Sequence, residues 1–321
     1  MLSVNKKACE LVRELYASPA DYCVSVERTR QGVTVIDVGV DAKGGFEAGR
    51  LVTEICMGGL GRARISARAY GEIQLPVISV CTDHPSVATL GSQFAGWRIE
   101  EGEFSAIGSG PARALALKPR DIFEKIGYAD DADVAVLVLE TSKKPYEELC
   151  IGLARECRIS PSQLYIIIVP TTSVAGAVQV SGRVVETGLH KLSRLGLDPL
   201  CVDLAWGCAP IASVHPKFVE AMGRTNDAVL YGGIAYYALR HKNDKELKAL
   251  LEKAPSSASR QHGKPFRLIF EEAGRDFYNI DPDLFAPAVF VVNNTATGSL
   301  FQVGEVDVDV LARSLGFSPL E

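Results

Sequence analysis

Apolar and polar residues follow two different periods along this chain. Nearly continuous apolar runs at 133–139 and 164–169 are typical of strands that are covered on both faces. Segments 145–157 and 174–195 instead repeat their apolar positions with a helical period, and Gly196 ends the second of them. The order strand, helix, strand, helix in this part of the chain predicts an α/β protein.

Further elements are expected on either side of this stretch. Ser3 is a suitable N-cap for a helix that runs to about Tyr16. The run 73–80 contains Pro76, and a strand with an internal proline is expected at the edge of a sheet. The remaining predicted elements are a hairpin at 23–26 and 33–38, helices at 46–57 and 244–253, and a second hairpin at 289–292 and 300–303.

The length of 321 residues favours two domains, because a typical domain has about 150 residues. The acidic loop at 130–133 is the expected boundary. It separates an N-terminal α/β domain, residues 1–130, with glycine-rich loops, from a C-terminal α/β domain, residues 131–321, that carries the helix at 174–195. Mixed sheets are expected in both domains, and the possibility that segments cross between them stays open.

The composition excludes several classes of protein. Hydrophobic residues make up 47% of the chain and charged residues 23%, so the chain can bury a large core and is not disordered. The net charge of −5 argues against binding to nucleic acid, which usually requires a basic excess. No apolar run approaches the ~18 residues of a membrane helix, and no secretory leader is recognisable. We therefore expect a cytoplasmic protein with no membrane partner.

Two glycine clusters have the composition of anion-binding loops. Gly58 to Gly61 precedes three arginines, and segment 108–115 predicts a tight loop that runs into a helix with Pro111 in its first turn. Free N–H groups at a helix start, together with Ser109 and Arg113, suit a phosphate or a carboxylate. Neither cluster matches a Walker loop or a G-x-G-x-x-G fingerprint. Anion binding and close packing of tight turns both remain open for these loops.

The helical segment 174–195 carries a charged stripe about a quarter turn away from its apolar stripe. Arg183 and Glu186 lie on the charged stripe, three residues apart, so their side chains can touch. A solvent-exposed ion pair, which contributes little to stability, is one interpretation. Gly182 and Gly188 favour another, because glycine inside a helix costs up to ~1 kcal/mol and suggests close approach by a second backbone or a ligand.

Several metal and catalytic motifs are missing from the sequence. It contains no C-x-x-C, no H-x-x-x-H and no G-x-S-x-G. We therefore expect neither a dedicated metal site nor the catalytic triad of an α/β-hydrolase.

A series of segments, in order along the chain, matches one known family. These segments are Leu2 to Ala8, Cys56 to Leu60, Ala106 to Leu115, Gln179 to Gly188, Thr225 to Gly233 and Phe285 to Val289. Together they resemble the methenyltetrahydromethanopterin cyclohydrolase family over essentially the whole chain. Several long segments in the same order are more specific than any single glycine loop.

The resemblance implies a function in one-carbon metabolism of archaea and some methylotrophic bacteria. The reaction would be the reversible hydrolysis of the 5,10-methenyl-tetrahydromethanopterin cation to 5-formyl-tetrahydromethanopterin. The resemblance also implies no metal and no separate cofactor, because the pterin is itself the substrate. It further implies a homotrimer in which each subunit has two α/β domains with a large pocket between them.

The resemblance also assigns roles to particular residues. The Arg and Glu of the family's active-site segment fall on Arg183 and Glu186. Relatives in this family carry Lys where this chain has Phe94, which affects how the anionic part of the substrate is held. The residues predicted to bind the substrate are Gln93, Phe94, Ser109, Gly110, Arg113, Asn226, Tyr231 and Gly232.

The chemistry of this reaction explains why a carboxylate is needed. The carbon of the cationic amidinium is already electrophilic, so the reaction requires a base for the attacking water and an acid for the leaving nitrogen. Glu186 is the candidate for both roles, with Arg183 favouring its ionised form. Two other interpretations remain: a nucleotide-dependent small-molecule kinase that uses the Gly108–Leu115 loop, and a non-catalytic pterin-binding protein.

Overall fold

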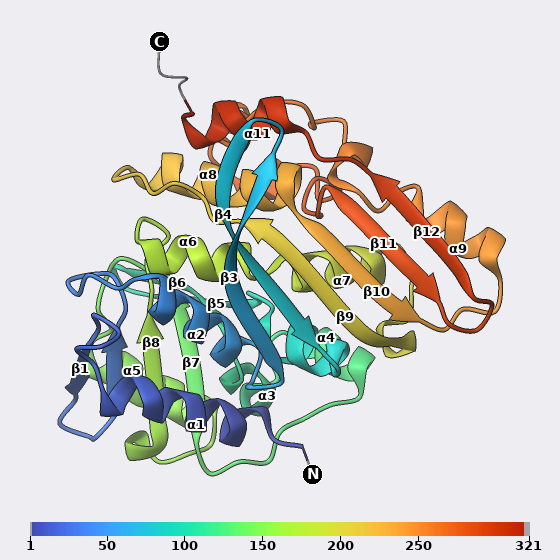
Figure 1. Cartoon of the computed structure of the whole chain (residues 1–321). Helices are drawn as coiled ribbons and strands as arrows, with labels where there is room; N and C mark the ends of the chain where they lie inside the picture. The colour runs from blue at the N-terminus through green and yellow to red at the C-terminus, as the bar shows by residue number, and fades with distance from the viewer. Residues whose placement is uncertain (1, 318–321) are drawn as a thin grey trace. The chain divides into compact units, whose positions relative to one another are not determined.

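The computed structural model describes residues 2–317, which divide into two compact units (Figure 1). Of the described residues, unit 1 holds 2–63 and 86–179, and unit 2 holds 64–85 and 180–317. The loop near residue 130, predicted to separate two domains, thus lies inside unit 1. Strands from before and after this loop pair in one sheet, which explains why the chain does not divide there.

Unit 1 is built on a mixed sheet of six strands in the order β1-β2-β8-β7-β6-β5. The inner strands β2, β8 and β7 are parallel, and the outer pairs are antiparallel. This pattern confirms the strand–helix–strand prediction for residues 133–169. The strands are β1 (Ser25–Arg28), β2 (Thr34–Asp37), β5 (Trp97–Glu101), β6 (Phe104–Ser109), β7 (Ala135–Glu140) and β8 (Leu164–Ile168).

Both faces of this sheet are covered, as the apolar run in β7 predicts. Val136 and Val138 belong to a core shared with α1 (Val4–Ala17) and α2 (Phe46–Cys56). Leu137 and Leu139 point to the other face, in a core shared with α5 (Glu147–Glu156). Alternate residues of a strand face opposite sides of the sheet. When helices cover both sides, the residues of both faces are apolar, and the sequence shows a continuous apolar run.

The start of α1 shows how the sequence determines a helix end. The Ser3 side chain accepts a hydrogen bond from the N–H of Lys6 at 3.2 Å, so the predicted N-cap is confirmed. Asp130 accepts further bonds from the Asn5 backbone and side chain at 2.9 and 2.8 Å. These bonds fix the helix start against the loop at 130–133. The other helices of unit 1 are α3 (Ala112–Ala116), α4 (Arg120–Ile126) and the π-helix η1 (Ser86–Gln93).

Unit 2 is built on a second mixed sheet of six strands, in the order β12-β11-β10-β9-β4-β3. β10 and β11 are parallel, whereas the pairs β9–β10, β11–β12 and β4–β9 are antiparallel. β11 and β12 form the predicted hairpin. The strands are β3 (Gly61–Tyr70), β4 (Ile73–Thr82), β9 (Val202–Pro210), β10 (Ile234–Leu239), β11 (Val289–Asn294) and β12 (Ser299–Gly304).

One strand prediction in this sheet is wrong. The segment with Pro76 was expected at an edge, but β4 lies between β9 and β3. Pairing with β9 begins at Val77, opposite Pro210, and the Pro76 carbonyl accepts a bond from the N–H of Ile211 at 2.8 Å. Proline is tolerated here because this position supplies an acceptor and no donor.

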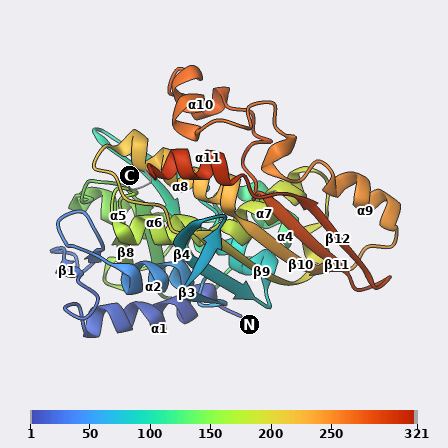
Figure 2. The same cartoon turned by 45° about the horizontal axis from the view of Figure 1, so that its top comes forward.

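The helices of unit 2 are α7 (Val184–Arg194), α8 (Phe218–Gly232), α9 (Asp244–Leu251), α10 (Phe266–Glu272) and α11 (Val308–Leu315). Figure 2 shows α11 running alongside α8, with α10 near them. The helix expected at 244–253 is thus confirmed as α9. Within residues 2–317, no helix has the length and apolar character needed to cross a membrane.

Candidate functional site

The segment predicted as one helix, 174–195, is two helices. α6 (Val174–Ser181) ends before Gly182, and α7 begins after Arg183. Arg183 is the N-cap residue of α7, with φ −85° and ψ 1°. Its N–H donates to the Val180 carbonyl at 3.0 Å, and its own carbonyl accepts from the Thr187 N–H at 2.8 Å. The break therefore places Arg183 directly at the N-terminus of a helix.

This arrangement puts Glu186 in the first turn of α7. The N-terminus of a helix carries a partial positive charge, which stabilises a carboxylate there. Glu186 has only 6% of its surface exposed and Arg183 only 8%. The interpretation of these two residues as a solvent-exposed ion pair is therefore wrong. Burying two charged side chains costs free energy unless their partners are well placed, which favours a functional role for this pair.

The candidate residues of unit 1 lie close together, although they are distant in sequence. The N–H of Gly110 donates to the Ser92 carbonyl at 2.9 Å, next to Gln93 at the end of η1. The Arg113 guanidinium lies 5.3 Å from the centre of the Phe94 ring. Ser109 lies beside Cys56, with its Oγ 3.8 Å from the Sγ. One cluster thus contains Gln93, Phe94, Ser109, Gly110 and Arg113.

Arg113 organises this cluster from its centre. It is completely buried, and its guanidinium donates to the carbonyls of Lys118, Leu90 and Ser92 at 2.7, 3.1 and 3.2 Å. The Phe94 and Phe123 rings both face the cation. These bonds hold the end of η1 against α3 and the segment that follows it. A direct contact between Arg113 and a substrate stays a prediction.

The substrate-binding candidates of unit 2 all lie on α8. The Asn226 side chain donates to the Met222 carbonyl at 2.9 Å. The buried Tyr231 hydroxyl donates to the Lys264 carbonyl at 2.7 Å and accepts from the Gly263 N–H at 3.2 Å. A Cβ at Gly232 would lie 2.6 Å from the Pro210 ring. These contacts assign Tyr231 and Gly232 packing roles inside unit 2, and their contact with a substrate stays a prediction.

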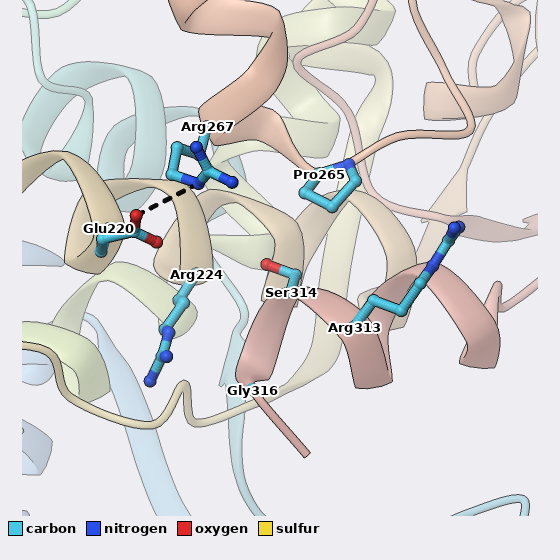
Figure 3. Close-up of a pocket in the computed structure, with 7 residues that line it drawn as sticks. All are labelled: Glu220, Arg224, Pro265, Arg267, Arg313, Ser314 and Gly316. Carbon is cyan, nitrogen blue, oxygen red and sulfur yellow. Dashed lines mark ion pairs between the residues drawn. The ribbon is translucent and has the colours of Figure 1, made fainter. Parts of the chain in front are cut away.

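A small cavity of unit 2 lies where α8, α10 and α11 meet (Figure 3). Its volume is about 110 Å³, and it is lined by Glu220, Arg224, Pro265, Arg267, Arg313, Ser314 and Gly316. Nothing in the sequence pattern pointed to it, because its three arginines come from separate parts of the chain.

The arginines of this cavity serve mainly to join the helices. Arg267 pairs with Glu220 at 3.2 Å, and Arg224 donates to the Ser213 hydroxyl at 2.8 Å. Arg224 and Arg313 point in different directions and not toward a common centre (Figure 3). An anion would not meet converging guanidinium groups here, so the cavity is not a strong candidate for a ligand site.

Metal-binding groups are not clustered in the part of the chain that the structure describes. Within residues 2–317, no three His, Cys, Asp or Glu side chains come together as a metal site would require. Arg183 and Glu186 thus remain the best candidates for acid–base chemistry.

Two mixed sheets with their helices define an α/β protein, and the buried Glu186 at the start of α7 is its candidate acid–base group. Comparison with known families gives a more specific result. The family described as "Cyclohydrolase (MCH)" matches residues 3–315. The chain therefore belongs to the methenyltetrahydromethanopterin cyclohydrolase family, as its sequence segments predict.

Relatives with this name match along their whole length. The protein of Methanocaldococcus jannaschii is 46% identical, with 100% of both chains covered. That of Methanothermobacter marburgensis is 46% identical, over 98% of this chain and 100% of its own. That of Methanococcoides burtonii is 40% identical, over 98% of this chain and 99% of its own. Each is named methenyltetrahydromethanopterin cyclohydrolase.

Proposed function

We propose that this chain is a hydrolase that acts on the C–N bond of a cyclic amidine. Its substrate is the 5,10-methenyl-tetrahydromethanopterin cation, and its product is 5-formyl-tetrahydromethanopterin, formed reversibly. The observation that carries this proposal is the 46% identity to the Methanocaldococcus jannaschii cyclohydrolase over the full length of both chains. The buried Glu186 in the first turn of α7 supports it chemically.

The reaction requires two proton transfers. Water attacks the methenyl carbon, a C–O bond forms, and one proton of the water passes to the Glu186 carboxylate. The C–N10 bond then breaks, N10 takes a proton from Glu186, and the formyl group remains on N5. The second proton of the attacking water is released to solvent as the formyl C=O bond forms. The positive charge of the substrate thus leaves as a proton. A single carboxylate can act as base and then as acid in this sequence.

Arg183 supports the carboxylate in this mechanism. Arg183 is the N-cap residue of α7, three positions before Glu186. A nearby cation favours the ionised form of the Glu186 carboxylate, which must accept the first proton. The negative charge of Glu186 also offsets the charge of the bound substrate. This attraction must not be too strong before water attacks, because only stabilisation of the transition state accelerates the reaction.

The remaining parts of the proposal follow from the chemistry and the family. The amidinium carbon needs no metal to become electrophilic, and the pterin is the substrate, so we propose no separate cofactor. We assign substrate binding to the unit 1 cluster around Arg113 and to Asn226, Tyr231 and Gly232 of unit 2. A homotrimer in the cytoplasm remains part of the proposal, on the basis of the sequence resemblance.

The two other interpretations gain no support from residues 2–317. The N–H of Gly110 and the guanidinium of Arg113, which a kinase would aim at a phosphate, donate to backbone carbonyls of the protein. The helix that follows, α3, spans only residues 112–116.

The test is hydrolysis of the methenyl cation, followed by the loss of its ultraviolet absorbance. Wild type should turn over rapidly in the presence of a chelator, and Glu186→Gln should lose at least about 100-fold in kcat. Glu252→Gln changes an exposed glutamate that follows α9 and should behave like wild type. Near-normal turnover by Glu186→Gln would remove this residue from the proton transfers, whereas an inactive, folded wild type would remove the reaction itself.

A further inference from the structure

A buried tyrosine of β10 contacts the backbone of the helix that carries Glu186. The Tyr237 hydroxyl donates to the Val185 carbonyl at 2.7 Å, and Tyr237 has no exposed surface. Val185 directly precedes Glu186 in the first turn of α7. A side chain from the sheet is thus bound to the peptide group that bears the proposed catalytic residue.

The N–H of Leu189 also lies near this hydroxyl. In an α-helix, the carbonyl of residue 185 is the natural partner of the N–H of residue 189. The phenol therefore lies beside both the Val185 carbonyl and the Leu189 N–H. The bond from Tyr237 thus ties the first turn of α7 to strand β10.

Gly188 creates the space for this contact. A Cβ at position 188 would lie 2.2 Å from the Tyr237 hydroxyl oxygen, so any other residue would displace it. Glycine inside a helix is otherwise unfavourable by up to ~1 kcal/mol. The close approach that the sequence indicates for Gly188 is therefore made by a tyrosine hydroxyl within unit 2.

Strand β9 holds the same turn from a second direction. A Cβ at Gly207 would lie 2.9 Å from Val185 Cγ2 and 3.0 Å from Val184 Cγ1, so the two valines pack directly on the β9 backbone. Burial, together with the nearby charge of Glu186, raises the pKa of Tyr237 well above its usual value. Tyr237 accordingly remains a protonated donor at every working pH.

We propose that Tyr237 is a positioning residue for Glu186, and that Gly188 provides the room it needs. This inference rests on the proposed role of Glu186. Without the phenol, the Val185 carbonyl loses this donor, and the first turn of α7 is held only by its own helix and by the packing of Val184 and Val185 on β9. Glu186 then moves relative to the water that it must deprotonate, while the groups that bind the pterin stay in place.

The test is Tyr237→Phe, which removes one oxygen and keeps the ring. We expect kcat to fall about 10- to 100-fold with KM changed less than about 3-fold, because a displacement near 1 Å of a catalytic group has effects of this size. The midpoint of the kcat–pH profile should also shift. Tyr236→Phe is the matched control, since Tyr236 is the adjacent, half-buried residue on the opposite face of β10, and it should leave all three quantities unchanged.

A second pair of variants separates positioning from stability. Gly188→Ala should lower kcat at least as far as Tyr237→Phe does, and the double variant should be no slower than Gly188→Ala and no faster than Tyr237→Phe, because the clashing oxygen is already gone. A Tyr237→Phe enzyme with a lower Tm but a normal kcat and pH profile would overturn the inference. If Glu186→Gln is inactive and Tyr237→Phe is normal, only this inference fails. If Glu186→Gln is active, the proposed role of Glu186 fails.

Discussion

Both carboxylate oxygens of Asp227 accept a hydrogen bond from the backbone N–H of Phe266, at 2.9 and 3.0 Å. The Ser314 hydroxyl also donates to this carboxylate. One completely buried side chain of α8 thus binds the first residue of α10 and the last turn of α11. The junction lies beside the cavity of Figure 3, which Ser314 also lines. Burial raises the pKa of Asp227 to about 7.

The first prediction concerns the pH dependence of stability that Asp227 causes. The folded protein binds its proton more tightly than the unfolded chain does, so the contribution of this group is fully present below about pH 4. It is lost as pH rises through about 7, by on the order of 3 kcal/mol. Asp227→Asn should remove this trend.

Urea unfolding at pH values from 4 to 8 measures this effect. The difference in unfolding free energy between wild type and Asp227→Asn should decrease steadily across that range. Asp309→Asn, at an exposed position of α11, is the control and should give a flat difference. A flat difference for Asp227→Asn as well would show that this carboxyl titrates normally.

The helix break between α6 and α7 shows what the sequence could and could not predict. The apolar period continues from Val178 through Val185 to Leu189, so the sequence alone indicates one helix. A single residue with altered dihedral angles, Arg183, hardly changes this period. The burial of Glu186 also depends on distant segments, and no local pattern reveals it.

The sequence pattern also fails to predict strand β9. Leu204 and Trp206 are 47% and 40% exposed, so its open face is apolar and the usual polar alternation is absent. By contrast, the Ser3 cap and the hairpin of β11 and β12 depend on local turn and capping chemistry, and the sequence predicts both correctly. Periodicity places Arg183 and Glu186 on one stripe of the sequence, whereas their acid–base role follows only from the family resemblance.

The second prediction concerns the completely buried Arg113. Arg113→Met removes three hydrogen bonds to backbone carbonyls while keeping much of the apolar stem. Those carbonyls lose their donors in a dry environment, so the unfolding free energy should decrease by about 2–4 kcal/mol. Chemical denaturation measures it, with Arg120→Met as the control at an arginine whose side chain is 81% exposed. A loss below about 0.5 kcal/mol would show that water replaces these bonds.

The third prediction concerns Phe94, where relatives are expected to carry lysine. The Phe94 ring faces the Arg113 guanidinium at 5.3 Å, and such a contact is worth about 0.5–2 kcal/mol. Phe94→Lys would replace this attraction with repulsion between two cations. The variant should therefore lose about 1–3 kcal/mol of stability. Phe94→Leu, which removes the ring without adding charge, should lose less, and equal losses would mean that charge has no influence here.

The fourth prediction concerns Lys191, a lysine of α7 with no exposed surface. Its amine donates to the side chain and the carbonyl of Asp283 at 2.8 and 3.0 Å, and burial lowers its pKa. Asp283→Ala leaves a buried cation without its carboxylate partner, so it should cost about 2–4 kcal/mol at pH 7.

This cost should decrease above pH 9, because the amine can then lose its proton and an uncharged amine is cheaper to bury. Unfolding measured at pH 7 and at pH 10 tests the difference, with Asp203→Ala as a control for an ion pair of which both side chains are well exposed. A cost that is equal at both pH values would show that Lys191 stays charged and finds another partner.

The fifth prediction concerns Arg183 and the pH profile of turnover. If the Arg183 cation favours the ionised form of Glu186, Arg183→Ala should raise the apparent pKa of the essential base and move the acidic limb of the kcat profile to higher pH. Arg183→Lys keeps the charge but not the planar guanidinium, so it should restore most of the acidic limb while leaving kcat lower. Measured profiles that coincide for wild type and Arg183→Ala would exclude an electrostatic role, and Arg183 would then act only as the residue that ends α6 and begins α7.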